Sequence, residues 1–261
     1  MSFARDVKKE ISNIEASNEV YKAELYGITK LKTSYIISNN SLNFEFVTNN
    51  NSLARRIVFL LKRVYEVSVE ILIKEQNKLD YKRLYYIVVK DRAQEILQDL
   101  DILSEGLEIY EGISSKYHHN DAVLRGMFLA KGSINDPYKS NYHLEIVCNY
   151  QEECDFLFKV LNQYSIEPKI VNRKKGKVVY LKKAEQIGDF LKIIGATNML
   201  FDFENQRIKR DLNNVVNRVL NCDMANSDRT QLSALKQLEN IRIIEENYGV
   251  ENLSPRLKEA M

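Results

Sequence analysis

The stretch Leu124–Ser133 (LRGMFLAKGS) has an earlier counterpart in Leu25–Ser34 (LYGITKLKTS). Glycine stands at the same place in both, since 126 − 27 = 99, and so does lysine, since 131 − 32 = 99. The match continues downstream, where Phe44–Asn49 (FEFVTN) parallels Leu144–Asn149 (LEIVCN). A long unit that occurs only twice differs from a solenoid repeat, and it indicates two related halves facing one another about a pseudo-twofold axis.

Hydrophobic periodicity gives both halves the same order of elements. An apolar helix that contains a glycine is followed by two strands, an amphipathic helix, two more strands and a closing helix. In the first half we expect helices at 3–14, 19–31, 52–65 and 93–103, with Ser52 as a helix cap, and strands at 35–38, 42–48, 67–74 and 84–90. A glycine at a helix centre lowers helix stability, so Gly27 and Gly126 need a packing reason. We expect the two helices to lie side by side at a seam, glycine against glycine.

Leu124–Gly132 resembles the nine-residue LAGLIDADG helix of homing endonucleases, with glycine at both glycine positions, and Leu25–Thr33 is a weaker copy. Nearly the whole chain is similar to the WhiA family of bacterial DNA-binding regulators, which is built on such a domain. The segments that carry this similarity are Ser2-Phe3, Ala54–Arg56, Leu60–Arg63, Tyr142–Ile146, Ile194–Ala196, Phe203–Asn205, Asn217-Arg218 and Asn221–Asn226. The resemblance implies an α+β fold of two pseudo-symmetric LAGLIDADG-type αββαββα halves, followed by a short all-α helical C-terminal segment.

The eighth position of the nonapeptide decides the chemistry. Active LAGLIDADG nucleases carry an aspartate or glutamate there, and the two carboxylates hold divalent cations that stabilise the attacking and leaving oxygens. This chain has Lys32 and Lys131 at these positions, and an ammonium group only donates hydrogen bonds and cannot ligate a cation. Each lysine is either a helix end whose amine reaches solvent, which we favour, or a phosphate contact. Both readings exclude metal-dependent cleavage, so we expect no catalytic residue, no metal and no cofactor.

Composition describes a globular protein of 261 residues, with 44% hydrophobic and 28% charged residues. No apolar run is long enough to span a membrane, and the first 17 residues are too charged for a signal peptide. Three cysteines without a Cys-x-x-Cys pair favour reduced thiols in the cytoplasm. We therefore expect a cytoplasmic, nucleoid-associated protein that uses neither a membrane nor a small-molecule substrate.

Positive charge is unevenly distributed, although the net charge is only +2. Residues 165–218 contain twelve Lys and Arg against six Asp and Glu, a balance of 12 − 6 = +6. Such a basic surface with nearby tyrosines suits contact with the phosphates of double-stranded DNA. The alternative, a solubilising turn beside ordinary strand packing, stays open. The candidate DNA-binding residues are Arg55, Arg56, Arg173, Lys174, Lys175 and Lys177, with Lys209, Arg210 and Arg218 as a secondary group.

We expect five segments in the chain: a first half with an N-terminal helix (1–104), a connector (105–120), a second half (121–220), a linker (221–229) and an incomplete helix-turn-helix-type segment (230–261). The linker is expected because a polar break at 221–228 separates helices at 205–220 and 230–247. In the WhiA family this region opens a helix-turn-helix module whose recognition helix comes later. The resemblance therefore implies a shortened module here, either a fragment or a natural variant.

Three classes of function fit these observations. The favoured one is a non-catalytic DNA-binding regulator, which the resemblance links to transcription, cell division and chromosome segregation, with other regulatory proteins as possible partners. The second is a LAGLIDADG-type maturase or a residual endonuclease acting on nucleic acid. The third is a protein-interaction scaffold whose basic face is incidental. DNA affinity that falls steeply with salt separates the first class from the third.

Overall fold

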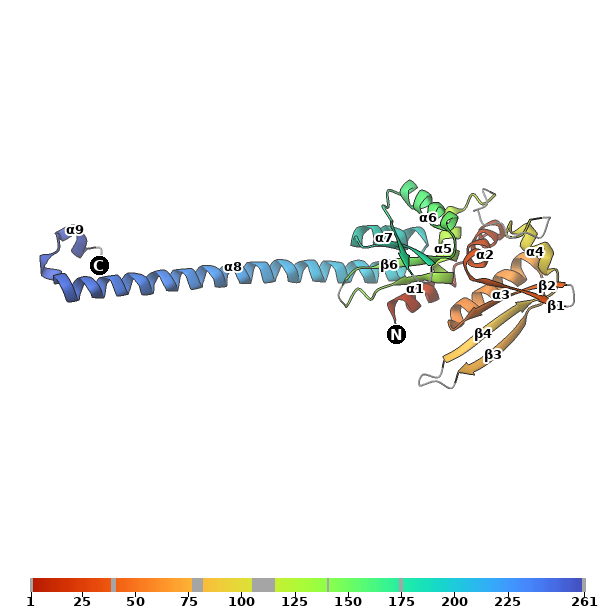
Figure 1. Cartoon of the computed structure of the whole chain (residues 1–261), viewed down its shortest axis with the longest axis horizontal. Coiled ribbons are helices and arrows are strands. Elements are labelled where there is room, and N and C mark those ends of the chain that lie inside the picture. The colour runs from red at the N-terminus through yellow and green to blue at the C-terminus, as the bar shows by residue number, and fades with distance from the viewer. Residues whose placement is uncertain are drawn as a thin grey trace. The chain divides into compact units, whose positions relative to one another are not determined.

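The computed structural model describes residues 2–38, 41–76, 82–104, 116–139, 141–173 and 176–259, and it shows two halves built in the same order (Figure 1). This confirms the expected α+β fold. After α1 (Phe3–Ile11), the first half comprises α2 (Asn18–Lys32), β1 (Thr33–Ser38), β2 (Ser41–Thr48), α3 (Asn51–Tyr65), β3 (Glu70–Gln76), β4 (Lys82–Val89) and α4 (Ala93–Asp99). The second half comprises α5 (Asn120–Lys131), β5 (Gly132–Ile134), β6 (Leu144–Cys148), α6 (Gln151–Gln163), β7 (Lys169–Arg173), β8 (Gly176–Leu181) and α7 (Ala184–Ile193). Most of the expected connector lies outside the described residues.

Each half contains a four-stranded antiparallel sheet, and the two sheets have the same strand order, β1-β2-β4-β3 and β5-β6-β8-β7. Their central registers also correspond, because Phe44 pairs with Val89 in the first sheet and Leu144 pairs with Leu181 in the second. All four of these side chains are buried. Since side chains alternate across a strand, equivalent registers place equivalent apolar residues on the core face of each sheet.

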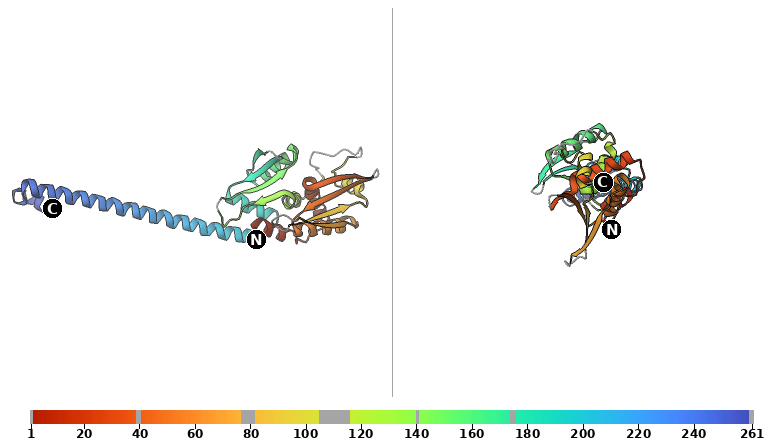
Figure 2. Two further views of the ribbon diagram at one scale, coloured as in Figure 1. Left: turned by 60° about the horizontal axis from the view of Figure 1, so that its bottom comes forward. Right: turned by 90° about the vertical axis from the view of Figure 1, so that its right-hand side faces the viewer.

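Helices α2 and α5 lie against each other where the two halves meet (Figure 2), and most of their residues are buried. A Cβ atom added to Gly27 would lie 2.4 Å from the carbonyl oxygen of Val123, and one added to Gly126 would lie 2.1 Å from that of Glu24. Each of these carbonyls comes three residues before the glycine of its own helix, so the contact is reciprocal. The seam is therefore a backbone-to-backbone contact that only glycine permits at both positions.

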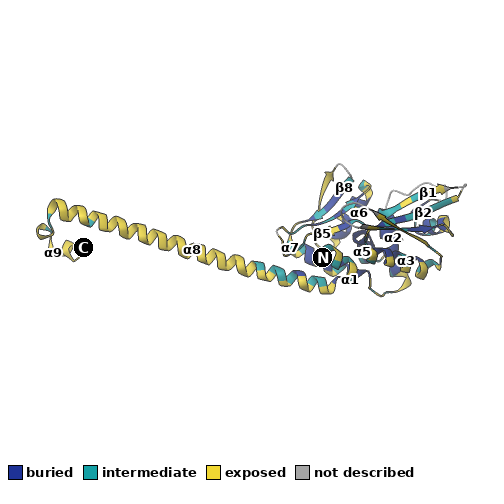
Figure 3. Ribbon diagram, turned by 90° about the horizontal axis from the view of Figure 1, so that it is seen from below, coloured by how far each residue is buried: buried dark blue, intermediate teal, exposed yellow. Residues whose placement is uncertain are grey.

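Helix α1 covers the core next to the seam between α2 and α5. Phe3, Val7 and Ile11 of α1 recur every four residues and are all buried, which is the pattern of a helix with one face against a core. The Phe3 ring lies 6.3 Å from the ring of Phe203, between centroids. Figure 3 shows buried residues concentrated in the two halves around α2 and α5.

The start of α3 differs from expectation. The helix begins at Asn51, so Ser52 lies within its first turn and is not the cap. The side chain of Asn50 accepts hydrogen bonds from the backbone N–H groups of Ser52 (2.9 Å) and Leu53 (3.3 Å). Asparagine is among the preferred N-cap residues, and its oxygen satisfies two backbone donors that a helix start leaves open.

Helix α8 (Thr197–Tyr248) continues through 221–228, so the prediction of a polar break between two helices was wrong. This stretch contains neither glycine nor proline, and the Asn226 side chain bonds within the helix, where its Nδ2 donates to Cys222 Sγ one turn earlier at 3.7 Å. The helix ends before Gly249, whose φ of 74° suits glycine, and η1 (Val250–Asn252) and α9 (Pro255–Lys258) follow. The chain forms two compact units, Met1–Arg207 and Ile208–Met261. Within the described ranges, no helix has the length and apolar character that a membrane crossing requires.

Candidate nucleic-acid interface

The C-terminal ends of the seam helices carry two neighbouring amines, because Lys32 ends α2 and Lys131 ends α5. Burial lowers the pKa of Lys32, and the positive charge of Lys131 lowers it further. Burial also lowers the pKa of Lys131. The two amines thus repel one another, at the positions that the LAGLIDADG resemblance matches to nuclease carboxylates.

Asn149, which follows β6, connects the ends of both seam helices. Lys131 Nζ donates to Asn149 Oδ1, and Asn149 Nδ2 donates to the Leu31 carbonyl at 3.4 Å. The amide therefore bridges the last turn of α2 and the last residue of α5. Because its oxygen accepts from the amine, it holds Lys131 in place without neutralising its charge.

A third amine, that of Lys8 on α1, lies close enough to Lys32 for their charges to interact. Its Nζ is 5.6 Å from the centroid of the Phe128 ring. Burial lowers the pKa of Lys8 to about 8, and the charge of Lys32 contributes to this lowering. Desolvation and like charge both disfavour an ammonium ion, and a nearby anion reverses both effects. We call Lys8, Lys32 and Lys131 the seam cluster.

Glu153, whose charge acts on Lys131, already has a structural role. Glu153 accepts hydrogen bonds from the backbone N–H groups of Asn149 (2.6 Å) and Tyr150 (3.3 Å) at the start of α6. Burial raises the pKa of Glu153, whereas these bonds and the charges of Lys30 and Lys131 oppose the rise. Over the described part of the chain, no three His, Cys, Asp or Glu side chains are grouped so that they could hold a metal ion. The seam cluster thus suits an anion better than a cation.

The basic residues predicted on the second sheet are only partly described. Glu145 alternates with the buried Leu144 and Ile146, so its side chain lies on the sheet face away from the core. Arg173 pairs with Glu145 at 2.9 Å and is half exposed on that face. Lys177 donates to Gln151 of α6. Lys174 and Lys175 lie outside the described residues.

Family models match three consecutive segments of the chain: the WhiA N-terminal LAGLIDADG-like domain at 18–103, the WhiA LAGLIDADG-like domain at 120–213 and the WhiA C-terminal HTH domain at 216–261. A "Probable cell division protein WhiA" of Lysinibacillus sphaericus is 41% identical over 263 residues, which cover 99% of this chain and 84% of that protein. The chain belongs to the WhiA family. A relative of the same name from Bacillus licheniformis is also 41% identical and covers 99% of this chain and 83% of its own length.

Solved structures of the WhiA family agree with the fold. The crystal structure of full-length DUF199/WhiA from Thermatoga maritima is 26% identical, with a TM-score of 0.68 over 99% of this chain and 84% of that one. The N-terminal LAGLIDADG domain of DUF199/WhiA is 24% identical, with a TM-score of 0.58 over 74% of this chain and 90% of that one. The HTH match begins at 216, within the region we expected to close the second half. This match does not support the prediction of an incomplete helix-turn-helix-type segment at 230–261.

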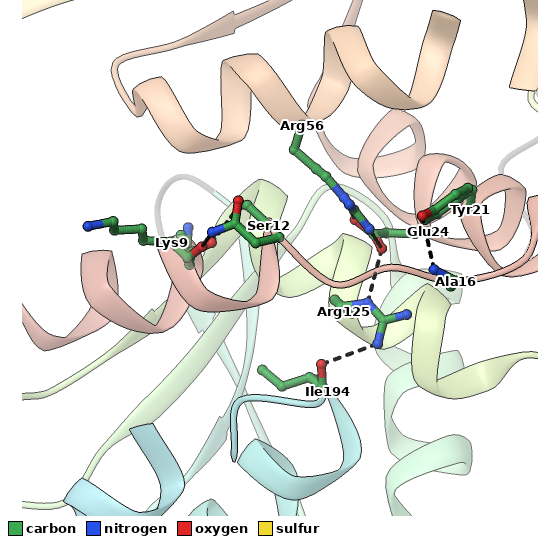
Figure 4. A network of polar contacts seen from close by, with 10 residues as sticks. Lys9, Ser12, Ala16, Tyr21, Glu24, Arg56, Arg125 and Ile194 are labelled. Carbon is green, nitrogen blue, oxygen red and sulfur yellow. Dashed lines mark hydrogen bonds and ion pairs between the residues drawn. The ribbon is translucent and has the colours of Figure 1, made fainter. Parts of the chain in front are cut away.

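Arg56 is not the phosphate contact that the sequence predicted, because its side chain is only 3% exposed. Its Nε and Nη2 donate to the two carboxylate oxygens of Glu24 at 2.7 and 2.8 Å. Arg125 of the second half donates to the same carboxylate at 3.0 Å and to the Ile194 carbonyl at 3.3 Å, as Figure 4 shows. This buried triad of Glu24, Arg56 and Arg125 joins the halves of this WhiA-family chain next to the close contact between Gly27 and Gly126.

The remaining candidate residues differ in exposure. Arg55 is exposed on α3, next to the buried Arg56. In the second unit, Lys209 and Arg218 are exposed on α8 and Arg210 is half-buried. Contact of these residues with DNA stays a prediction.

Sequence reasoning missed Lys8 and the buried triad. Lys8 reaches the seam only through the packing of α1, which no local pattern reveals. Glu24 did leave a signal, since a carboxylate one turn before the glycine of an apolar helix is buried and requires a buried cation. The equivalent position in the second half holds Val123, so the repeat itself marked Glu24 as different.

Proposed function

We propose that this WhiA-family chain is a non-catalytic DNA-binding protein whose first unit holds duplex DNA without cutting it. The observation that carries this proposal is the pair of partly buried amines at the ends of α2 and α5, Lys32 and Lys131. Cleavage by the LAGLIDADG mechanism needs carboxylates that hold divalent cations at these positions. Two amines repel such cations and attract phosphate oxygens.

The seam cluster supplies positive charge of the kind that divalent ions contribute in an active nuclease. Lys8, Lys32 and Lys131 all have lowered pKa values because they are desolvated and, for Lys8 and Lys32, because another lysine is near. A backbone phosphate placed among them accepts charge-assisted hydrogen bonds and removes the mutual repulsion. Such contacts position DNA without reading its sequence.

The sheet faces extend this contact along the duplex. Arg173 stands on the outer face of the second sheet, and the ring of His143 lies 5.6 Å from that of Tyr180, between centroids. In the first sheet, Lys74 Nζ lies 4.8 Å from the centroid of the Tyr86 ring. A cation held over an aromatic ring at a sheet surface, as Lys74 is over Tyr86, suits a phosphate backbone. Base reading then belongs to the segment matched by the HTH model.

We infer a role in cell division, since relatives that share 41% of their residues with this chain carry the name "Probable cell division protein WhiA". DNA binding without cleavage fits a regulator of transcription. A part in chromosome segregation, partner proteins and a place on the nucleoid in the cytoplasm belong to the same proposal.

Supercoiled plasmid incubated with the full chain and Mg²⁺ tests the proposal. The protein is expected to retard the plasmid in a gel and to leave all of it supercoiled after the protein is removed. Conversion to nicked circles that requires Mg²⁺ would show a nuclease. Preferential binding of a structured RNA over duplex DNA in competition would instead indicate a maturase.

A further inference from the structure

The part of α8 that belongs to the second unit carries an exposed stripe of four apolar residues, which Cys222 and Asn226 continue at the same spacing. Its members are separated alternately by four and three residues, and the first four are 54–63% exposed. Within the second unit, every residue from Leu212 to Asn240 is exposed, so no described side chain of that unit covers these residues. The members of the stripe are Ile208, Leu212, Val215, Val219, Cys222 and Asn226.

This spacing has a period of 3.5 residues, which is that of the a and d positions of a coiled coil. Ile208, Val215 and Cys222 occupy position d, and Leu212, Val219 and Asn226 occupy position a. A solvated helix with such a stripe gains little from its own hydrogen bonds, because most helix stability in proteins comes from burying an apolar face. The stripe therefore requires a cover.

We propose that a second copy of this chain covers the stripe, with the two α8 segments forming a parallel two-stranded coiled coil over Ile208–Asn226. In this arrangement each a residue meets the same a residue of the partner, and each d residue meets its equivalent. A copy of the stripe is its own complement in size and period, which is the isologous contact typical of twofold dimers.

Two observations favour the parallel orientation. Asn226 at position a meets Asn226 of the other copy, so the two amides satisfy each other, and such a layer fixes register in parallel dimers. An antiparallel pair that kept the stripe in contact would place Asn226 against an apolar residue such as Ile208. The flanking charges also agree, because Arg218 at position g faces Asp223 at position e of the partner.

The consequence concerns DNA recognition. The HTH-matched segment begins at residue 216, within the proposed coiled coil, so a parallel pair places two copies of this segment side by side and in the same direction. Dimers of helix-turn-helix proteins bind two half-sites, so a DNA target with paired half-sites follows from the proposal.

Sedimentation of the full chain across a concentration series tests the association. We expect a monomer–dimer equilibrium in which Leu212→Asp raises the dissociation constant by about tenfold or more, the equivalent of about 1.4 kcal/mol. Leu220→Asp is the matched control, because Leu220 lies at position b of the same helix and is similarly exposed, 53% against 62%. The control is expected to dimerise like the unmodified chain. A monomer at every concentration, or equal effects of the two changes, overturns the proposal.

Cross-linking through Cys222 tests the orientation. Cys222 is exposed, whereas Cys148 and Cys154 are buried and burial raises the pKa of both thiols. Mild oxidation with copper–phenanthroline is expected to give a covalent dimer through paired Cys222 residues at position d. Cys222→Ser combined with Met224→Cys, which moves the thiol to the outer position f, is expected to give none. Equal cross-linking of both variants overturns the parallel arrangement, and so does a dimer that does not cross-link through Cys222.

Discussion

Replacing Glu24 by alanine is expected to destabilise the first unit by about 3–5 kcal/mol, because it leaves two buried guanidinium groups without their counterion. Arg56 and Arg125 are 3% and 5% exposed, and the same carboxylate accepts from both. Urea denaturation followed by circular dichroism measures the change in the free energy of unfolding.

Glu19→Ala is the matched control, because Glu19 lies on the same helix and its side chain is 88% exposed. It is expected to unfold like the unmodified protein. A second variant separates charge burial from packing: Glu24→Leu with Arg56→Met and Arg125→Met removes the whole triad and is expected to recover most of the lost stability. If Glu24→Ala proves as stable as Glu19→Ala, the buried triad does not join the halves.

Replacing Gly126 by alanine is expected to destabilise the fold by about 3 kcal/mol, although alanine is the better helix former. The added Cβ would lie 2.1 Å from the Glu24 carbonyl oxygen and 3.0 Å from the Ile28 nitrogen. Both are backbone atoms of α2, which cannot rotate away as a side chain does. The two helices would have to separate along the whole seam. The urea midpoint of Gly126→Ala measures this effect.

Gly188→Ala provides the comparison, since Gly188 also lies inside a helix, α7. There the added Cβ would lie 2.6 Å from Glu204 Oε1, the far end of a flexible side chain that can move aside. We expect a change within about 1 kcal/mol, the range of helix propensity alone. Equal midpoints for the two variants would mean that the seam tolerates a Cβ atom and is not a close backbone contact.

The fold was predictable because the sequence contains the same pattern of elements twice. The 99-residue offset between Gly27 and Gly126 and the parallel between the strand at Phe44 and the strand at Leu144 fix two halves with one topology. What the repeat cannot reveal is asymmetry. Glu24 has no counterpart in the second half, where Val123 stands, and its partners Arg56 and Arg125 come from both halves.

The prediction that Arg56 contacts phosphate was wrong, and the helical periodicity of α3 already indicated that this side chain is buried. On α3, the buried residues Leu53, Ile57 and Leu60 mark the core face, and Arg56 follows Leu53 by three and precedes Leu60 by four. Those spacings put Arg56 on the core face and leave Arg55 outside it. A count of positive residues does not consider where each residue lies around the helix axis. That position decides which of two adjacent arginines is exposed to solvent.

The break expected within α8 was wrong for a different reason. Polar residues at 221–228 resemble a loop in composition, yet the segment holds no glycine or proline to end a helix. The sequence could not predict the role of Lys8, because Lys8 approaches Lys32 only through the packing of α1. Composition and local pattern therefore gave the two halves, whereas the seam cluster needed the tertiary structure.

We propose above that Lys32 and Lys131 contact DNA phosphates where a nuclease would hold metal ions. Its most direct test is the salt dependence of duplex affinity for the full chain with Lys32→Gln and Lys131→Gln together. A control variant, Lys159→Gln with Lys192→Gln, removes two exposed lysines of α6 and α7. Fluorescence anisotropy at a series of salt concentrations is expected to show a slope of log K against log salt that is shallower by about 2 for the seam variant alone. Equal slopes for the seam variant and the unmodified chain would contradict the account.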